Sequence, residues 1–239
     1  MFSLFHAFAA INMKADQTIS GTALNMFAPA FAIFIARRLT GTQQIQFTNT
    51  FRISSVPVLG DIPVIGNLFF KNTYITTYIG FAILIISTVV LYYTRFGLRL
   101  RSCGEHPQAA DSVGINVYKM QYAGVIISGA LGGLGGLVFV VPTSTNFNAS
   151  VAGYGFLALA VLIFGQWHPV KIFGASVFFG LMKTIAATYS SIPVLSTSGI
   201  PSYIYKMIPY IATLIVLVFT SKNSQAPKAE GIPYDKGAR

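Results

Sequence analysis

Few side chains in this sequence could do chemistry. Among its 239 residues are three histidines, one cysteine and six acidic residues. No H-E-x-x-H motif occurs, and no group of histidines and cysteines has metal-ligand spacing. No serine, histidine and acid fall at one depth of the helices expected below. The sequence therefore predicts no enzyme, no bound cofactor and no metal site.

Glycines are the next candidates, because glycine-rich segments can cradle phosphates. The segment Gly124–Leu137 reads GVIISGALGGLGGL. It lacks the G-x-G-x-x-G spacing after a strand, and Lys183-Thr184 lacks the preceding glycine of a P-loop, so neither motif for nucleotide binding is present. Small residues on one helix face instead favour close helix packing in lipid. The residues expected to do this are Gly124, Ser128, Gly129, Gly132, Gly133 and Gly136.

The composition is that of a membrane protein. Hydrophobic residues make up 54% of the chain and charged residues 9%, whereas about 25% are charged in soluble proteins. The net charge of +10 fits basic loops on an anionic inner leaflet, and nucleic acid is not expected as a partner. The single Cys103 excludes an internal disulfide and fits a reducing face of the membrane.

Six apolar segments predict an all-α, polytopic transmembrane helical bundle. The fourth segment is short, and the preceding Thr143–Ala152 is too polar to face lipid. Irregular backbone at membrane depth must be buried in protein or line a cavity, so this segment is a short or broken helix. The expected spans are Ile19–Leu39, Ile75–Thr94, Met120–Val141, Gly153–Gly165, Val170–Thr188 and Tyr203–Thr220.

Basic residues predict the orientation, since lysine and arginine are enriched in cytoplasmic loops. With the loop Arg95–Lys119 inside, the outer face holds Arg37, Arg38, Arg52, Lys71 and Lys206, and the Arg37-Arg38 pair counts against this orientation. We expect one transmembrane domain over residues 1–221 and a polar cytoplasmic tail over 222–239. The inner face then holds Lys14, Arg95, Arg99, Arg101, Lys119, Lys171, Lys222, Lys228, Lys236 and Arg239.

Polar groups inside the spans are candidates for a path through the membrane. Asn25 serves either to bind a neighbouring helix or to line such a path. Asn146 and Asn148, which precede the short fourth segment, are further candidates for this path. For Lys183 we favour a side chain that snorkels to the interface over a functional group.

The polar stretch Arg95–Lys119 is the best pointer to function. Pro107 is a good first residue of a helix, and Pro107–Ile115 gives about two and a half turns. Ala109, Ala110 and Val113 are expected to share a face, and Gly114 to end the helix. A short amphipathic helix of this kind can dock in a groove of a partner. An ordinary cytoplasmic connector is the alternative.

Residues Cys103–Ile115 resemble the cytoplasmic coupling segment of bacterial ABC-importer permeases, in the family that handles ribose, branched-chain amino acids and nucleosides. The ordered resemblance covers nearly the whole chain. Its further stretches are Ala15–Gln17 with Ile19–Asn25, Ser128–Gly136, Gly155–Ala160, and Ala226–Lys228 with Gly231–Tyr234.

The resemblance implies a multi-pass permease subunit of the bacterial plasma membrane. Its partners would be the lipid bilayer, a second permease subunit, cytoplasmic ATPase subunits and an extracytoplasmic substrate-binding lipoprotein. ATP bound by the ATPase subunits would drive alternating access, with nucleosides as the expected substrate and ribose-type sugars as the alternative. The residues that match the ATPase-coupling segment are Glu105, His106, Pro107, Ala109, Ala110, Asp111, Val113 and Gly114.

One feature departs from the family pattern. Such permeases carry further helices before the segment that begins here, and Phe5–Phe8 is similar to the middle of a family helix. We therefore expect N-terminal helices of the family to be lacking. A truncated, non-transporting assembly subunit and an intramembrane enzyme are the alternatives from other classes.

Overall fold

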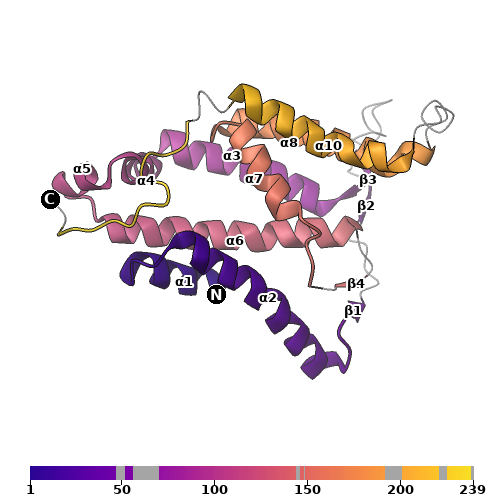
Figure 1. Cartoon of the computed structure of the whole chain (residues 1–239), viewed down its shortest axis with the longest axis horizontal. Coiled ribbons are helices and arrows are strands. Elements are labelled where there is room, and N and C mark those ends of the chain that lie inside the picture. Colours follow the sequence, from indigo (N-terminus) through magenta and orange to yellow (C-terminus); the bar gives the residue numbers. More distant parts are fainter. Residues whose placement is uncertain are drawn as a thin grey trace. The chain divides into compact units, whose positions relative to one another are not determined.

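The computed structural model describes residues 1–46, 52–55, 70–143, 146–147, 149–191, 201–220 and 225–237. Two compact units are formed, the first by residues 1–152 and 227–239 and the second by residues 153–226. Helices make up most of both units (Figure 1). The first unit contains α1 (Phe2–Ala7), the π-helix η1 (Phe8–Asn12), α2 (Gln17–Thr40), β1 (Ile45–Gln46), β2 (Arg52–Ser55), β3 (Lys71–Tyr74), α3 (Ile75–Tyr93), α4 (Arg95–Glu105), α5 (Pro107–Ser112), α6 (Val117–Thr143) and β4 (Asn146–Phe147). The second contains α7 (Tyr154–Phe164), α8 (Pro169–Thr188), the 3-10 turn η3 (Tyr189–Ser191) and α10 (Ser202–Thr220).

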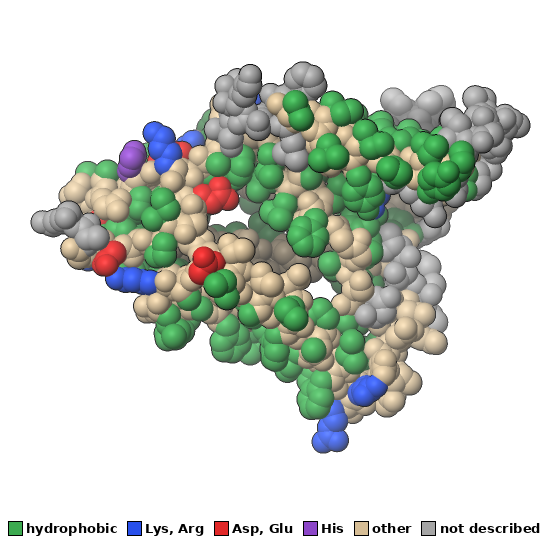
Figure 2. All heavy atoms as spheres, viewed as in Figure 1, with side chains coloured by type: hydrophobic (Ala, Val, Ile, Leu, Met, Phe, Trp, Pro, Cys, Tyr) green, Lys and Arg blue, Asp and Glu red, His purple; other side chains and the backbone are tan. Residues whose placement is uncertain are grey.

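The prediction of an all-α membrane protein is confirmed. Four helices in the described part of the chain are long and apolar enough to cross a membrane: Gln17–Thr40, Ile75–Tyr93, Val117–Pro142 and Pro169–Thr188. No more than 17% of the apolar stretch of any of them is buried within the chain. Many large apolar side chains of these helices are exposed, and apolar side chains cover much of the surface visible in Figure 2. An outward apolar surface of this kind suits a lipid environment, and the protein is a multi-pass membrane protein.

The expected short fourth segment is α7, which has only 11 residues. Such a helix is about 16 Å long, roughly half the thickness of the hydrocarbon core. The chain enters it through residues with positive φ, Ala149, Ala152 and Gly153. Before this turn, Phe147 pairs with Ile45 and Asn146 with Gln46, so β4 and β1 form an antiparallel ladder. The two residues of β4 thus have backbone partners on β1.

The long helices of the first unit separate two polar ends. Figure 1 shows β1–β4 at one end of α2, α3 and α6, and α4, α5 and the C-terminal segment at the other. Asp16 begins α2 by accepting hydrogen bonds from the amides of Thr18 and Ile19, and Gly41 ends it in the left-handed conformation. Within the first unit, the first end includes Arg52 of β2 and Lys71 of β3, and the second includes Arg95, Arg99 and Arg101 of α4. Which end is cytoplasmic remains a prediction.

A sharp bend joins α3 to α4. The Thr94 side chain accepts a hydrogen bond from the Gly97 amide at 3.2 Å, which caps the start of α4. A side chain at Gly97 would overlap the backbone of Val90 and Leu91. The bend therefore requires glycine at this position, and it turns the chain from the apolar helix α3 directly into the basic helix α4.

Aromatic side chains fill the centre of the second unit. The Phe179 ring is 1% exposed and meets the rings of Phe164 and Phe178 edge-on at 5.9 and 5.3 Å. Gly165 lies against Ile172, leaving no room for a side chain between α7 and α8. Tyr189 and Tyr205 stack at 5.0 Å, which links η3 to α10. The short α7 is thus held by its neighbours α8 and α10.

Close packing on the glycine-rich helix α6 can be tested at Gly129. A side chain there would overlap Ser3 of α1, whereas no described atom lies within 4 Å of the corresponding position at Gly132. Gly129→Leu should destabilise the protein by about 1–3 kcal/mol through overpacking. Gly132→Leu, the matched control on the same helix, should leave the melting temperature of the isolated chain in detergent unchanged, because this position contacts no described atom within the chain. Equal losses in both variants would contradict this assignment of the tight contact to Gly129.

Candidate functional site

The coupling segment begins where α4 ends. His106 ends α4 through its amide, which donates to the Ser102 carbonyl at 3.0 Å, and Pro107 is the first residue of α5. Proline fits this position because its fixed φ suits a helix and its missing N–H would have had no helical partner. Glu105 and His106 are both exposed at this corner. The expected helix start at Pro107 is confirmed.

Gly114 ends α5, as predicted. Its φ is +85°, its amide donates to the Asp111 carbonyl at 2.9 Å, and the Ile115 amide donates to the Ala110 carbonyl at 3.1 Å. These two bonds form a Schellman motif, which needs a left-handed residue at this position and favours glycine. The helix itself is shorter than predicted, since regular α-helix ends at Ser112. The two hydrogen bonds of the Schellman motif take the place of a further helical turn.

The prediction that Ala109, Ala110 and Val113 share one face of α5 is wrong for Ala110. Ala110 is only 3% exposed and Pro107 is buried, whereas Ala109 is exposed and Val113 is 75% exposed. Successive residues on a helix are about 100° apart, so Ala110 points away from the Ala109–Val113 row. The inner face of α5 packs within the chain. Its outer face presents Ala109 and Val113, a small and an apolar side chain.

A small hydrophobic core lies beneath α5. Cys103, Ala110, Val117 and Tyr234 form it, with exposed fractions between 1% and 5%. The Tyr234 ring meets the ring of Tyr118 edge-on, at 5.4 Å between centroids. Burial raises the pKa of the Cys103 thiol, partly offset by a hydrogen bond with Ser102. Four separate parts of the chain, α4, α5, α6 and the C-terminal segment, therefore share one core.

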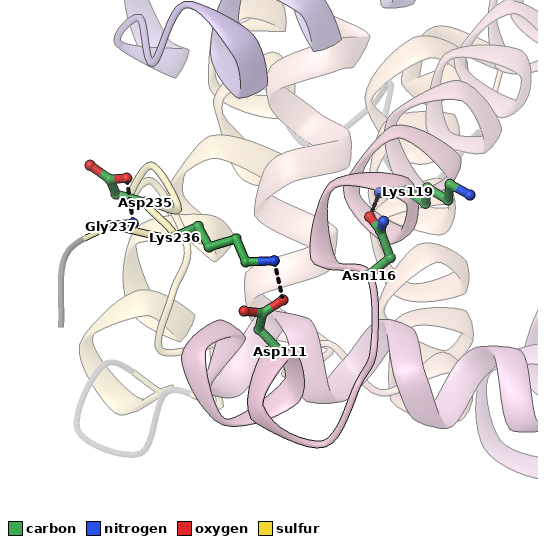
Figure 3. Close-up of polar contacts among 6 residues, drawn as sticks. All are labelled: Asp111, Asn116, Lys119, Asp235, Lys236 and Gly237. Atoms are coloured by element: carbon green, nitrogen blue, oxygen red, sulfur yellow. Dashed lines mark hydrogen bonds and ion pairs between the residues drawn. The ribbon is translucent and has the colours of Figure 1, made fainter.

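The C-terminal segment Pro227–Gly237, hereafter the strap, folds across this corner. The Ala229 amide donates to the Gly104 carbonyl at 2.9 Å. The Lys236 ammonium lies 3.7 Å from the Asp111 carboxylate (Figure 3), and the Asp235 carboxylate lies 2.6 Å from the Lys14 ammonium. Composition alone predicts only a polar tail here. The signal for the strap is Tyr234, an aromatic residue within that polar stretch.

Charge partners and burial shift two groups of the strap. The Lys14 ammonium, and then the Gly237 amide, lower the pKa of the Asp235 carboxyl. Burial, and then the Asp111 carboxylate, raise the pKa of the Tyr234 hydroxyl. Since the folded-state pKa of Asp235 is depressed, its contribution to stability is present above its unfolded pKa and is lost as the pH falls through the folded value.

The candidate residues for a path lie on separate elements. Asn25 is exposed on α2, Asn146 is half-buried in β4 opposite Gln46, and Asn148 lies outside the described residues. A cavity of about 230 Å³ in the first unit is lined by both polar and apolar residues, among them His6, Ile11, Gln17, Gln121, Val125 and Tyr234 of the strap. The role of the three asparagines as a translocation path remains a prediction.

The glycine row of α6 is only partly in contact. A side chain at Gly124 would lie 3.3 Å from Leu100, and one at Gly129 would overlap Ser3. No described atom lies within 4 Å of a side-chain position at Gly132, Gly133 or Gly136, and Ser128 is exposed. Close helix packing at these last four positions remains a prediction.

Lys183 has aromatic neighbours in the second unit. Its ammonium lies 4.7 Å from the centre of the Tyr154 ring and 5.8 Å from that of Tyr210. A cation within about 6 Å of a ring face is attracted by the ring electrons. One charged side chain of α8 thereby contacts both α7 and α10. In the described part of the chain, no cluster of three His, Cys, Asp or Glu residues could hold a metal ion.

Comparison with known proteins extends the resemblance to almost the full length. Residues 1–217 match the family described as the branched-chain amino acid transport system / permease component. The chain belongs to this permease family. No solved structure matches the chain.

Three relatives illustrate the family. The guanosine ABC transporter permease protein NupQ of Bacillus subtilis is 46% identical, over 100% of this chain and 75% of the relative. The nucleoside ABC transporter permease protein NupC of Lactococcus lactis is 44% identical, over 99% of this chain and 74% of the relative. A second permease of the same organism, NupB, is 28% identical over 65% of this chain and 42% of its own length.

Lys183 is expected to stabilise the helix packing of this permease. Lys183→Leu should lower its stability by about 0.5–2 kcal/mol, because both cation–π contacts are lost. Lys183→Arg should retain the melting temperature in detergent, and Tyr210→Phe, which keeps the ring, should do the same. If Lys183 instead binds the transported solute, Lys183→Leu would raise the KM of uptake and leave the melting temperature unchanged.

Proposed function

We propose that this chain is the transmembrane permease subunit of an ABC importer that moves nucleosides across the bacterial plasma membrane. The observation that carries the proposal is its 44–46% identity, over 99–100% of the chain, to permeases named for guanosine and for nucleosides. The low charged fraction of the chain, 9%, also suits a neutral solute better than a charged amino acid, which would need a compensating ion in the bilayer.

The partners follow from the class of transporter. ATP would be bound by separate cytoplasmic ATPase subunits, and a substrate-binding lipoprotein would deliver the solute outside. A second permease subunit is supported by the similarity of this chain to both NupC and NupB, two nucleoside permeases of one organism. In this arrangement the end that carries α4, α5 and the strap is cytoplasmic.

The outer face of α5 is the proposed contact with the ATPase. Ala109 and Val113 are exposed at an end of the first unit where the neighbouring Glu105, His106 and Asp111 are polar. A short helix that offers a small and an apolar side chain suits a groove in a partner protein. The buried Ala110 supports this role from beneath by fixing how α5 lies.

Coupling can be tested at Ala109. Ala109→Arg places a long charged side chain on the proposed contact, so co-purification of the ATPase should fall by about tenfold or more, as for a lost interface contact of over 1.4 kcal/mol. Ala109→Ser is the matched control, since serine is small and uncharged, and it should retain the ATPase. Normal co-purification and uptake with Ala109→Arg would make α5 an ordinary connector.

The substrate can be tested by uptake. Labelled guanosine, uridine and ribose should be offered to cells with the intact operon and to cells that lack this gene. Loss of nucleoside uptake alone is expected, with recovery when the gene is returned on a plasmid. Loss of ribose uptake alone would show that the substrate is a sugar and not a nucleoside. If uptake of all three compounds is unchanged, this permease imports neither class.

A further inference from the structure

We propose that the strap is a positioning element for α5, with Tyr234 as its anchor, and that coupling to the ATPase depends on it. The proposal rests on the proposed function, because it assigns the strap a role in docking the ATPase. Figure 3 shows how Lys236 of the strap points toward Asp111 of α5. The strap therefore contacts the same short helix whose outer face is proposed to meet the partner.

A helix as short as α5 needs support from its surroundings. It has six residues, and isolated helices of fewer than about 12 residues are marginal in water. The orientation of α5 must therefore come from packing of its inner face. That face consists of Pro107 and Ala110, and Ala110 lies in the core that Tyr234 completes.

Tyr234 is the strongest of the strap's contacts. It is 5% exposed, in a chain segment whose neighbours Ile232, Asp235 and Lys236 are more open to solvent. Its ring packs on Tyr118 of α6, and an aromatic pair of this geometry stabilises beyond the area that it buries. The two ion pairs of the strap are half exposed and contribute less, since solvent screens them. They fix where the strap lies, while Tyr234 holds it there.

The backbone supplies a further attachment on α4. The Ala229 amide donates to the Gly104 carbonyl, one of the carbonyls at the end of α4, and Pro227 packs 3.4 Å from the side-chain position of Gly104. Glu230 and Ile232 donate back to Pro227 and Ala229, which folds the strap into a turn. With Lys14 bound to Asp235, the strap joins α4, α5, α6 and the segment before α2.

Cys103 gives a direct measure of whether the strap is closed. It is the only cysteine of the chain, it is 5% exposed, and it lies in the core with Tyr234. Alkylation by N-ethylmaleimide would be followed in the solubilised importer complex, by mass spectrometry of the peptide that contains Cys103. Tyr234→Ala should raise the labelling rate about tenfold or more, because local opening of the strap no longer requires extraction of a buried ring.

Two variants provide the comparison. Tyr234→Phe keeps the aromatic pair and should label like the unaltered protein, with normal ATPase retention and uptake. Tyr234→Ala should in addition lose ATPase from the complex and slow nucleoside uptake, while its amount in the membrane stays the same. If Tyr234→Ala does not accumulate, Tyr234→Leu takes its place, since leucine fills part of the core but loses the aromatic pair with Tyr118, and the same results are expected.

The outcomes separate the strap from the proposed function. Unchanged labelling of Cys103 in Tyr234→Ala would overturn the strap as a cover of this core. Faster labelling with normal ATPase retention and uptake would overturn its role in positioning α5. Ala109→Arg should lose the ATPase with Cys103 still protected; if it keeps the ATPase, the docking role of α5 fails, and the positioning role of the strap fails with it.

Discussion

The need to pair every backbone amide within the bilayer determines the rest of this structure. An unpaired N–H or C=O in hydrocarbon costs several kcal/mol, and a helix avoids this cost because it pairs these groups within its own segment. The four long apolar helices meet this need by themselves. Where the chain leaves helical geometry before α7, β4 finds its partners on β1 instead. In the first unit, the basic helix α4, the short helix α5 and the strap lie together at one end of the long helices (Figure 1).

At this end of the first unit, the two faces of α5 have different roles. Ala110 belongs to a core formed by four parts of the chain, whereas Ala109 and Val113 are free to meet another protein. Such a division lets a helix of six residues keep a defined orientation and still present a contact surface. The rest of the first unit, through α4, α6 and the strap, supplies the support that the short helix lacks.

Features that depend on local chemistry could be predicted from the sequence. Hydropathy gives the long helices and the short α7, and Pro107 and Gly114 mark the two ends of α5, because these residues act through their own φ angles. Contacts between distant residues could not be predicted. The sequence does not say that Tyr234 packs on Tyr118, or that Ala110 rather than Ala109 faces inward, since both depend on which segment lies beneath. The sequence likewise does not distinguish Gly129 from the neighbouring glycines of α6, because its tight contact depends on Ser3 of α1.

The linker between α5 and α6 is short, and hydrogen bonds hold most of its residues. Only Val113–Asn116 separate the two helices, Gly114 and Ile115 are bound back to α5, and Asn116 accepts from the amides of Lys119 through its side chain and Met120 through its backbone. A linker in which nearly every residue is hydrogen-bonded is rigid rather than flexible. A tilt of the first turn of α6 would therefore move α5 with it.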